Sequence, residues 1–170
     1  LFDALTVAEN IFIGHAPTNR FGLIDWKEIH VRARDILDSI GARIDPRHRL
    51  SELGIANRHM VAVARALSVD ARVVIMDEPT AALGVQETQM VSELIKELKK
   101  QGLGIFLISH DIHDVFDLAD RVAVMKNGKL VGSARTQDVT KDEVLGMIIL
   151  GKCPDGAVPG PGAFTDASAA

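Results

Sequence analysis

The amino-acid sequence predicts an α/β fold with a mostly parallel sheet, a helical subdomain at the front and an antiparallel ribbon near the end. Two apolar runs, residues 73–76 and 104–108, are rich in β-branched side chains and indicate strands buried on both faces. Between them lies an amphipathic helix with apolar residues at Val91, Leu94, Ile95 and Leu98. A strand, a helix and a second strand in this order are typical of a parallel sheet.

The front of the chain is mostly helical. Asp25, with Glu28 three residues later, resembles a capping box, because the aspartate oxygen can accept hydrogen bonds from the first free amides of a helix. Apolar residues continue behind it at helical spacing up to Gly41, which supplies the stop. A second helix is expected from about residue 58 to residue 67.

The part of the chain after the second strand predicts a helix over residues 111–119 and a strand over 121–125. Asn127-Gly128 then indicates a type I′ hairpin, because both residues tolerate a positive φ. Thr140 and Glu143 form a capping box that opens a last helix, which runs to about residue 150.

Three regions follow from this pattern. Residues 1–68 are expected to form a helical subdomain, and residues 69–151 part of an α/β core. From residue 152 onward Pro, Gly and Ala dominate, and such a segment buries too little apolar area to offset its ordering entropy. Residues 152–170 are therefore expected to be a flexible tail.

Composition excludes several classes of function. The chain has 170 residues with 19 Lys+Arg and 23 Asp+Glu, a net charge of −4 without a basic block, so nucleic acid is not expected as a partner. The single cysteine, Cys153, rules out an internal disulfide framework and fits a reducing compartment. No apolar run approaches the ~18 residues that a membrane span needs.

The strongest chemical signal is a pair of carboxylates, Asp77 and Glu78, directly after the first strand. Ligands of α/β proteins bind at the carboxyl ends of parallel strands, where Asp77 could hold Mg²⁺ through water and Glu78 could polarise an attacking water. The alternative is that the two acids only precede a turn at Pro79 and cap the next helix. His110 follows the second strand, so it too is expected at this edge, where an imidazole can hydrogen-bond a terminal phosphate.

These residues carry a resemblance to a known family. Residues 73–80 resemble the Walker B motif of ABC-type transport ATPases, and Ser109-His110 resembles their switch histidine. Residues 5–14 are similar to the entry into the family's helical subdomain, and residues 20–26 to monosaccharide importers of the ribose, xylose, galactose and fructose group. The similarity runs from Leu1 to about Gly151 and implies a partial P-loop NTPase fold.

The resemblance implies a function and a set of partners. Two ATP-binding subunits or fused halves form a head-to-tail dimer around ATP and Mg²⁺, and their movement drives a transmembrane sugar permease. A periplasmic sugar-binding protein takes part indirectly. The subunit is peripheral, on the cytoplasmic face of the inner membrane. In this family Asp77 is the Mg²⁺-linked acid, Glu78 the general base and His110 the sensor of the γ-phosphate.

Two motifs depart from the family pattern. The signature Leu-Ser-Gly-Gly-Gln aligns with Leu53-Gly54-Ile55-Ala56-Asn57. Gly54 removes a hydroxyl that would bond the γ-phosphate of the opposing nucleotide, Ala56 adds a methyl where backbone would approach phosphate, and Asn57 shortens the glutamine. Gly84 ends a loop that lacks the serine and aspartate of Ser-Ala-Leu-Asp. A lost hydrogen bond to a charged group costs about 1.5–3 kcal/mol.

The phosphate loop of the family is expected upstream of Leu1, on sequence that is not present here. Residues 146–153 approach its spacing, but a capped helix occupies them and Cys153 replaces the Mg²⁺-binding hydroxyl. We therefore expect the chain to be the carboxyl-terminal portion of a longer subunit, to leave apolar surface uncovered, and to neither bind ATP tightly nor hydrolyse it alone. Two other hypotheses remain: a degenerate half-site that does not hydrolyse ATP, and a soluble ABC ATPase without a transport role.

Overall fold

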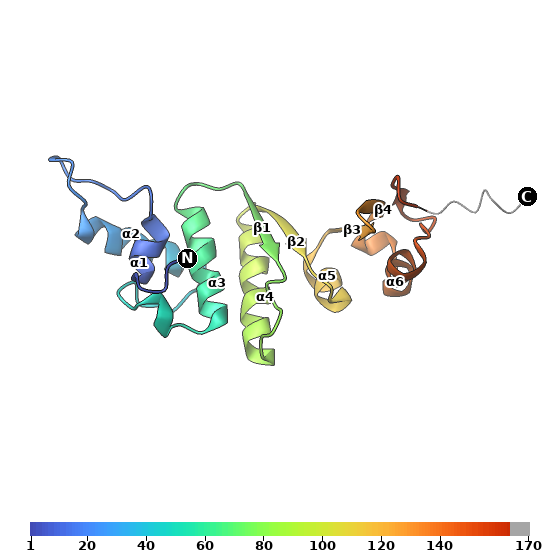
Figure 1. Ribbon diagram of the computed structural model, residues 1–170, viewed down its shortest axis with the longest axis horizontal. Helices are drawn as coiled ribbons and strands as arrows, with labels where there is room; N and C mark the ends of the chain where they lie inside the picture. The colour runs from blue at the N-terminus through green and yellow to red at the C-terminus, as the bar shows by residue number, and fades with distance from the viewer. Residues whose placement is uncertain (164–170) are drawn as a thin grey trace, which may run out of the picture. The chain divides into compact units, whose positions relative to one another are not determined.

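The computed structural model describes residues 1–163, which fall into two compact units. The first unit is Leu1–Ile108 and the second begins at Ser109 (Figure 1). The boundary expected after residue 68 lies inside the first unit, because helix α3 (Ile55–Leu67) packs against helix α4 (Val85–Lys100). The helical front and the first two strands therefore form one body.

Three helices form the front of the first unit. They are α1 (Val7–Phe12), α2 (Trp26–Ser39) and α3, with a short 3-10 turn at Leu50–Glu52 before α3. Asp25 caps α2 as predicted, since its carboxylate accepts a hydrogen bond from the Glu28 amide at 3.0 Å. The apolar sides of the three helices meet in a core whose fully buried members include Ile11, Leu37 and Val61.

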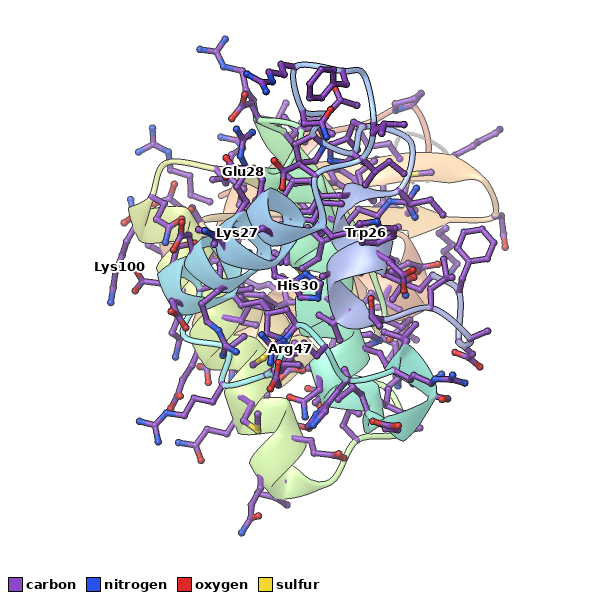
Figure 2. The ribbon with its side chains drawn as sticks, turned by 90° about the vertical axis from the view of Figure 1, so that its left-hand side faces the viewer. Trp26, Lys27, Glu28, His30, Arg47 and Lys100 are labelled. Carbon is purple, nitrogen blue, oxygen red and sulfur yellow. The ribbon has the colours of Figure 1, made fainter. Side chains whose placement is uncertain are left out.

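The outer side of α2 is mostly polar, although Trp26 and Val31 are also exposed there. Figure 2 labels Trp26, Lys27, Glu28 and His30 along the first turns of this helix. Glu28 forms an ion pair with Arg32 one turn later at 2.7 Å, and both side chains are about half exposed. Exposed pairs of this kind contribute little to stability, so the buried side of α2 holds the helix in place.

Strands β1 (Val73–Asp77) and β2 (Gly104–Ile108) form the predicted parallel pair, joined through α4. The expectation of strands buried on both faces is wrong here, because burial alternates along β1. Val74 and Met76 are buried, whereas Val73 and Ile75 are 63% and 70% exposed, and Phe106 on β2 is 59% exposed. In the described structure this sheet has two strands, and the exposed side chains named above lie on one of its faces. This agrees with the expectation that apolar surface is left uncovered.

The second unit is built on an antiparallel ribbon. Strands β3 (Arg121–Lys126) and β4 (Lys129–Arg135) pair across the predicted turn, where Asn127 has φ 50° and Gly128 has φ 74°. Helices α5 (Ile112–Leu118) and α6 (Lys141–Leu150) complete the unit. One face of the ribbon is buried in a core whose members are Val122, Val124, Val131, Ala134, Val139, Val144 and Met147.

Part of the expected tail is structured. Strand β5 (Val158–Pro159) pairs antiparallel with β4, and the thiol of Cys153 lies beside Gly132, where a Cβ atom would be only 2.8 Å from the sulfur. Burial raises the pKa of this thiol. The segment differs from the prediction because Gly132 leaves room on β4 for a second layer of chain. Residues 164–170 of the expected tail lie outside the described residues.

The helices within residues 1–163 are short or carry charged residues. None of the helices in this range is both long enough and apolar enough to cross a bilayer.

Candidate functional site

The two carboxylates predicted to carry chemistry lie at the carboxyl edge of the parallel pair. Asp77 is the last residue of β1 and is opposite Ile108, the last residue of β2. The Glu78 amide donates a hydrogen bond to the Ile108 carbonyl at 2.9 Å, so the pairing extends one residue beyond β1. Asp77 is exposed and Glu78 is half-buried. The edge of the sheet thus presents two neighbouring acids, as the sequence predicts.

The backbone turns sharply after β1. Glu78 has φ 47°, a left-handed conformation that non-glycine residues rarely adopt. Ala82, four residues on, has φ 61°. Two such residues in one short loop store backbone strain of order 1–3 kcal/mol each, and strain of this kind clusters at functional sites. The turn redirects the chain from the strand edge into α4.

The altered signature stretch, residues 53–57, forms the start of α3. Gly54 is the N-cap of this helix, with φ −66° and ψ 165°, and residues 55–57 are its first turn. Gly54 has no side chain to accept a hydrogen bond, and the first turn contains no acidic residue. The first amides of α3 are therefore not bonded by a capping side chain of their own, and such amides favour an anion.

The altered loop residue, Gly84, starts α4 in the same way. Its φ of −71° and ψ of 164° are extended, and its amide donates to the Glu87 carboxylate at 3.3 Å. The other oxygen of Glu87 lies 3.7 Å from the position that a Cβ atom of Gly54 would take. One carboxylate thus stands at the starts of both helices.

The structure brings these two altered positions together, which sequence reasoning missed. Gly54 and Gly84 are 30 residues apart in the chain, and Glu87 is the residue that lies next to both. A local signal did exist, because a glutamate three residues after a helix start is half of a capping box. The contact of Glu87 with Gly54 depends on the packing of α3 against α4, for which the sequence offered no sign.

His110 belongs to the second unit, where it precedes α5 and is exposed. Its neighbour Asp111 caps that helix, accepting a hydrogen bond from the His113 amide at 2.8 Å. Ser109 in turn accepts a hydrogen bond from the Asp111 amide at 3.0 Å. This local network fixes the backbone on either side of His110. The relation of His110 to Glu78 stays a prediction, because the two residues belong to different units.

The near match to a phosphate loop is helical, as the capping box at Thr140 predicts. Residues 146–150 lie in α6, and Gly151 ends the helix with φ 72° while its amide donates to the Met147 carbonyl at 3.0 Å. A phosphate loop wraps free amides around phosphates, whereas these amides are engaged within a helix. This stretch is therefore a structural helix end.

Comparison with known proteins gives two kinds of match. Residues 1–81 match the family model described as "ABC transporter". The chain is 52% identical over 149 residues to the ribose import ATP-binding protein RbsA 1 of Rhizobium meliloti, covering 88% of this chain and 30% of that protein. It is 52% identical over 159 residues to the ribose import ATP-binding protein RbsA of Roseobacter denitrificans, covering 94% of this chain and 31% of that protein.

Solved structures agree on the fold. CbiO1 of Clostridium perfringens, part of the ABC transporter complex cbiONQ, aligns with a TM-score of 0.69 at 26% identity, over 88% of this chain and 59% of that chain. An ATP-binding cassette of an ABC transporter in its ADP conformation aligns with a TM-score of 0.67 at 22% identity, over 86% and 59%. The chain spans about 30% of the length of the ribose-import relatives named above. Residues 1–81 thus match the ABC transporter family, the fold is that of ATP-binding cassettes with a partial P-loop NTPase architecture, and the relatives of the chain include sugar-import ATP-binding proteins.

Proposed function

We propose that this chain is part of an ATP-binding subunit that powers import of a monosaccharide through a membrane permease. The observation that carries the proposal is the placement of Asp77 and Glu78 at the carboxyl edge of β1, on a strained turn beside the end of β2. The printed names of the relatives, which are ribose import ATP-binding proteins, support the substrate class. The whole subunit would act at the cytoplasmic face of the membrane.

The chemistry proposed for the two acids differs. Asp77 presents an exposed carboxylate at the strand end, and carboxylate oxygen with water is the ligand environment that Mg²⁺ prefers, so its donor chemistry fits the metal. Mg²⁺ held there would neutralise charge on the transferred phosphoryl group. Glu78 orients or deprotonates the attacking water, and His110 hydrogen-bonds the terminal phosphate.

The amides around the phosphates have to come from other residues. Phosphoryl transfer requires a cradle of backbone amides and a lysine. We propose that this cradle belongs to the portion of the ribose-import relatives that the chain does not span. The start of α3, residues 54–57, then faces the nucleotide bound by a second ATP-binding subunit or half, in a head-to-tail dimer.

The test of the catalytic assignment is Glu78→Gln in the full-length subunit with its permease. We expect ATP turnover to fall by about 10²-fold or more, the usual contribution of a general base, with MgATP binding retained. Glu93→Gln is the matched control, since Glu93 is exposed on α4 and accepts a hydrogen bond from Gln89 one turn away, at 3.2 Å. Turnover within twofold of wild type in Glu78→Gln would remove Glu78 from this role.

A second candidate function is a degenerate half-site that binds nucleotide without productive hydrolysis. The altered signature favours it. Gly54 lacks the hydroxyl of the family signature, Ala56 lacks the bare backbone of a glycine, and Asn57 lacks the longer amide side chain. The carboxylate of Glu87 beside Gly54 adds negative charge where a phosphate would approach.

The combined variant Gly54→Ser, Ala56→Gly and Asn57→Gln discriminates between the two functions. A gain in turnover of about tenfold or more, the size of one restored charge-assisted hydrogen bond, supports the degenerate half-site. Wild-type turnover that is already fast and does not change favours the catalytic subunit. Co-purification of the full-length subunit with a membrane permease separates both from a soluble ABC ATPase.

A further inference from the structure

A single arginine in α3 contacts the loop that precedes its own helix. Arg58, in the second turn of α3, donates from Nε to the Leu53 carbonyl at 3.0 Å and from Nη2 to the Ser51 carbonyl at 3.4 Å. Its Nη1 donates to Oδ1 of Asp3 at 3.0 Å, across 55 residues of sequence. Three donors of one guanidinium thus engage three acceptors from two segments.

The hydrogen bonds of Arg58 restrain the start of α3, which has no side-chain cap at residue 54. Gly54 has no side chain to bond the amides of α3, and glycine permits more backbone conformations than any other residue. The two carbonyls that Arg58 bonds flank Glu52, just before this glycine. Their fixation restricts the entry of the chain into α3, and with it the direction in which the amides of residues 54–57 point.

The geometry suits arginine and not lysine. A guanidinium is planar and presents its donors as a rigid fork, whereas the lysine ammonium is a single point on a flexible stem. The Arg58 side chain is 33% exposed and the Asp3 side chain 64% exposed, so the pair alone is screened by water. The two hydrogen bonds to the carbonyls therefore fix the orientation of the guanidinium relative to the loop. Asp3 restrains the guanidinium through its remaining nitrogen.

We infer that Arg58 is a positioning residue for the phosphate-facing start of α3, with Asp3 as its anchor. The inference rests on the proposed function, in which residues 54–57 face the nucleotide of a second subunit. In this inference Arg58 acts on the backbone at the helix start and not on the nucleotide. It replaces, from behind the helix start, the conformational restraint that a side-chain cap at residue 54 would provide.

The experiment uses the full-length subunit and three variants: Arg58→Ala, Arg58→Lys and Asp3→Asn. Arg32→Ala is the control, because Arg32 also forms an ion pair, with Glu28 on α2, but touches no loop carbonyl in the described structure. Three quantities are measured: MgATP binding by the single subunit, ATP-dependent association of two subunits in the ultracentrifuge, and hydrogen exchange of the amides of residues 53 and 58. These two amides stand on either side of the helix start and donate to the Leu50 and Gly54 carbonyls, each at 3.1 Å.

We expect Arg58→Ala to leave MgATP binding by the single subunit unchanged and to weaken ATP-dependent association by about tenfold, the effect of one charge-assisted hydrogen bond. Hydrogen exchange at the amides of residues 53 and 58 should rise at least tenfold, because their hydrogen bonds depend on the restrained helix start. Arg58→Lys and Asp3→Asn should show smaller effects of the same kind, and Arg32→Ala none.

The outcomes separate the inference from the function beneath it. Unchanged exchange at the amides of residues 53 and 58 in Arg58→Ala overturns the inference, and this measurement needs no nucleotide. A parallel loss of MgATP binding, association and melting temperature also overturns it, because a general structural role would produce that pattern. A wild-type subunit that binds no MgATP overturns the proposed function, while the exchange measurement still decides whether Arg58 orients the start of α3.

Discussion

Helices α1 and α6 begin at a threonine, whereas helices α3 and α4 begin at a glycine. The backbone is almost the same at both kinds of start: φ and ψ are −68° and 163° at Thr6, and −71° and 164° at Gly84. At the threonines a complete capping box satisfies the first amides from within the helix. At the glycines the restraint comes from Glu87 and, for α3, from Arg58.

The difference separates the threonine starts, which are structural, from the glycine starts, of which that of α3 is proposed to face a nucleotide. A threonine cap fills the position at which a phosphate could bind the amides, so it suits a helix whose only task is to fold. A glycine leaves that position accessible, and more distant residues then have to hold the geometry. This comparison predicts that stability depends strongly on side chains near α1 and only weakly on those at residues 54 and 84.

The largest effect is expected at Asn10, next to the α1 start. Asn10 is fully buried and bonds the amide and the carbonyl of Phe2, at 2.7 and 3.0 Å, and the Thr6 carbonyl at 2.9 Å. Asn10→Ala removes these three hydrogen bonds of a fully buried side chain, each with a net contribution of about 1 kcal/mol, so we expect a loss of about 3 kcal/mol of unfolding free energy in urea denaturation. Gln86→Ala, which removes an exposed amide side chain on α4, is the control. A loss below about 1 kcal/mol would contradict the importance assigned to this region.

Thr6→Ala comes next. Its hydroxyl accepts a hydrogen bond from the Glu9 amide at 3.2 Å, and Glu9 accepts one from the Thr6 amide at 2.7 Å. Loss of a helix cap costs about 1 kcal/mol, to be measured by urea denaturation. Thr18→Ala, at an exposed loop position, should change stability by less than about 0.5 kcal/mol. Equal effects at the two threonines would show that the box at α1 adds nothing specific.

The capping glutamates make the threonine starts sensitive to pH. Hydrogen bonds from the Thr6 side chain and amide lower the pKa of Glu9 from 4.5, and the Thr140 amide lowers that of Glu143. A carboxyl whose pKa is lower in the folded state stabilises the fold above its unfolded pKa, and this contribution is lost as pH falls through the folded value. Stability should therefore fall below about pH 4.5, and Glu9→Gln should flatten part of that fall in acid denaturation. A pH profile identical to wild type would contradict the assignment.

The local features of this molecule follow from its sequence more readily than its contacts do. Asp25 and Thr140 cap their helices as predicted, because a cap depends on residues three positions apart. The Asn127-Gly128 turn follows from the backbone preferences of two adjacent residues. Asp77 and Glu78 were placed correctly at a strand end because a parallel strand and its neighbour end at the same edge.

The contacts between distant segments were not visible in the sequence. Strand β1 is exposed on one face because burial depends on which neighbours cover a sheet, and a run of apolar residues does not say which are present. Strand β5 pairs with β4 because Gly132 makes room for it. The bond between Arg58 and Asp3 joins residues 55 positions apart, and no periodic pattern relates them. Such contacts depend on tertiary packing.

The smallest effect, and the most direct comparison of the two kinds of start, is expected at residue 84. The extended backbone of Gly84 matches that of Thr6, and a Cβ atom there would have as its nearest neighbour an oxygen of Glu87 at 4.0 Å, so serine fits without strain. Gly84→Ser should raise the unfolding free energy by about 0.3 kcal/mol, because serine exceeds glycine as a cap by only a few tenths. Gly84→Ala should lower it, since alanine offers no acceptor and is a poorer cap than glycine. Opposite signs from two small side chains in urea denaturation would show that the missing acceptor, and not the missing volume, distinguishes the glycine starts. Changes of equal sign would instead show that the missing acceptor does not distinguish the start of α4 from that of α1.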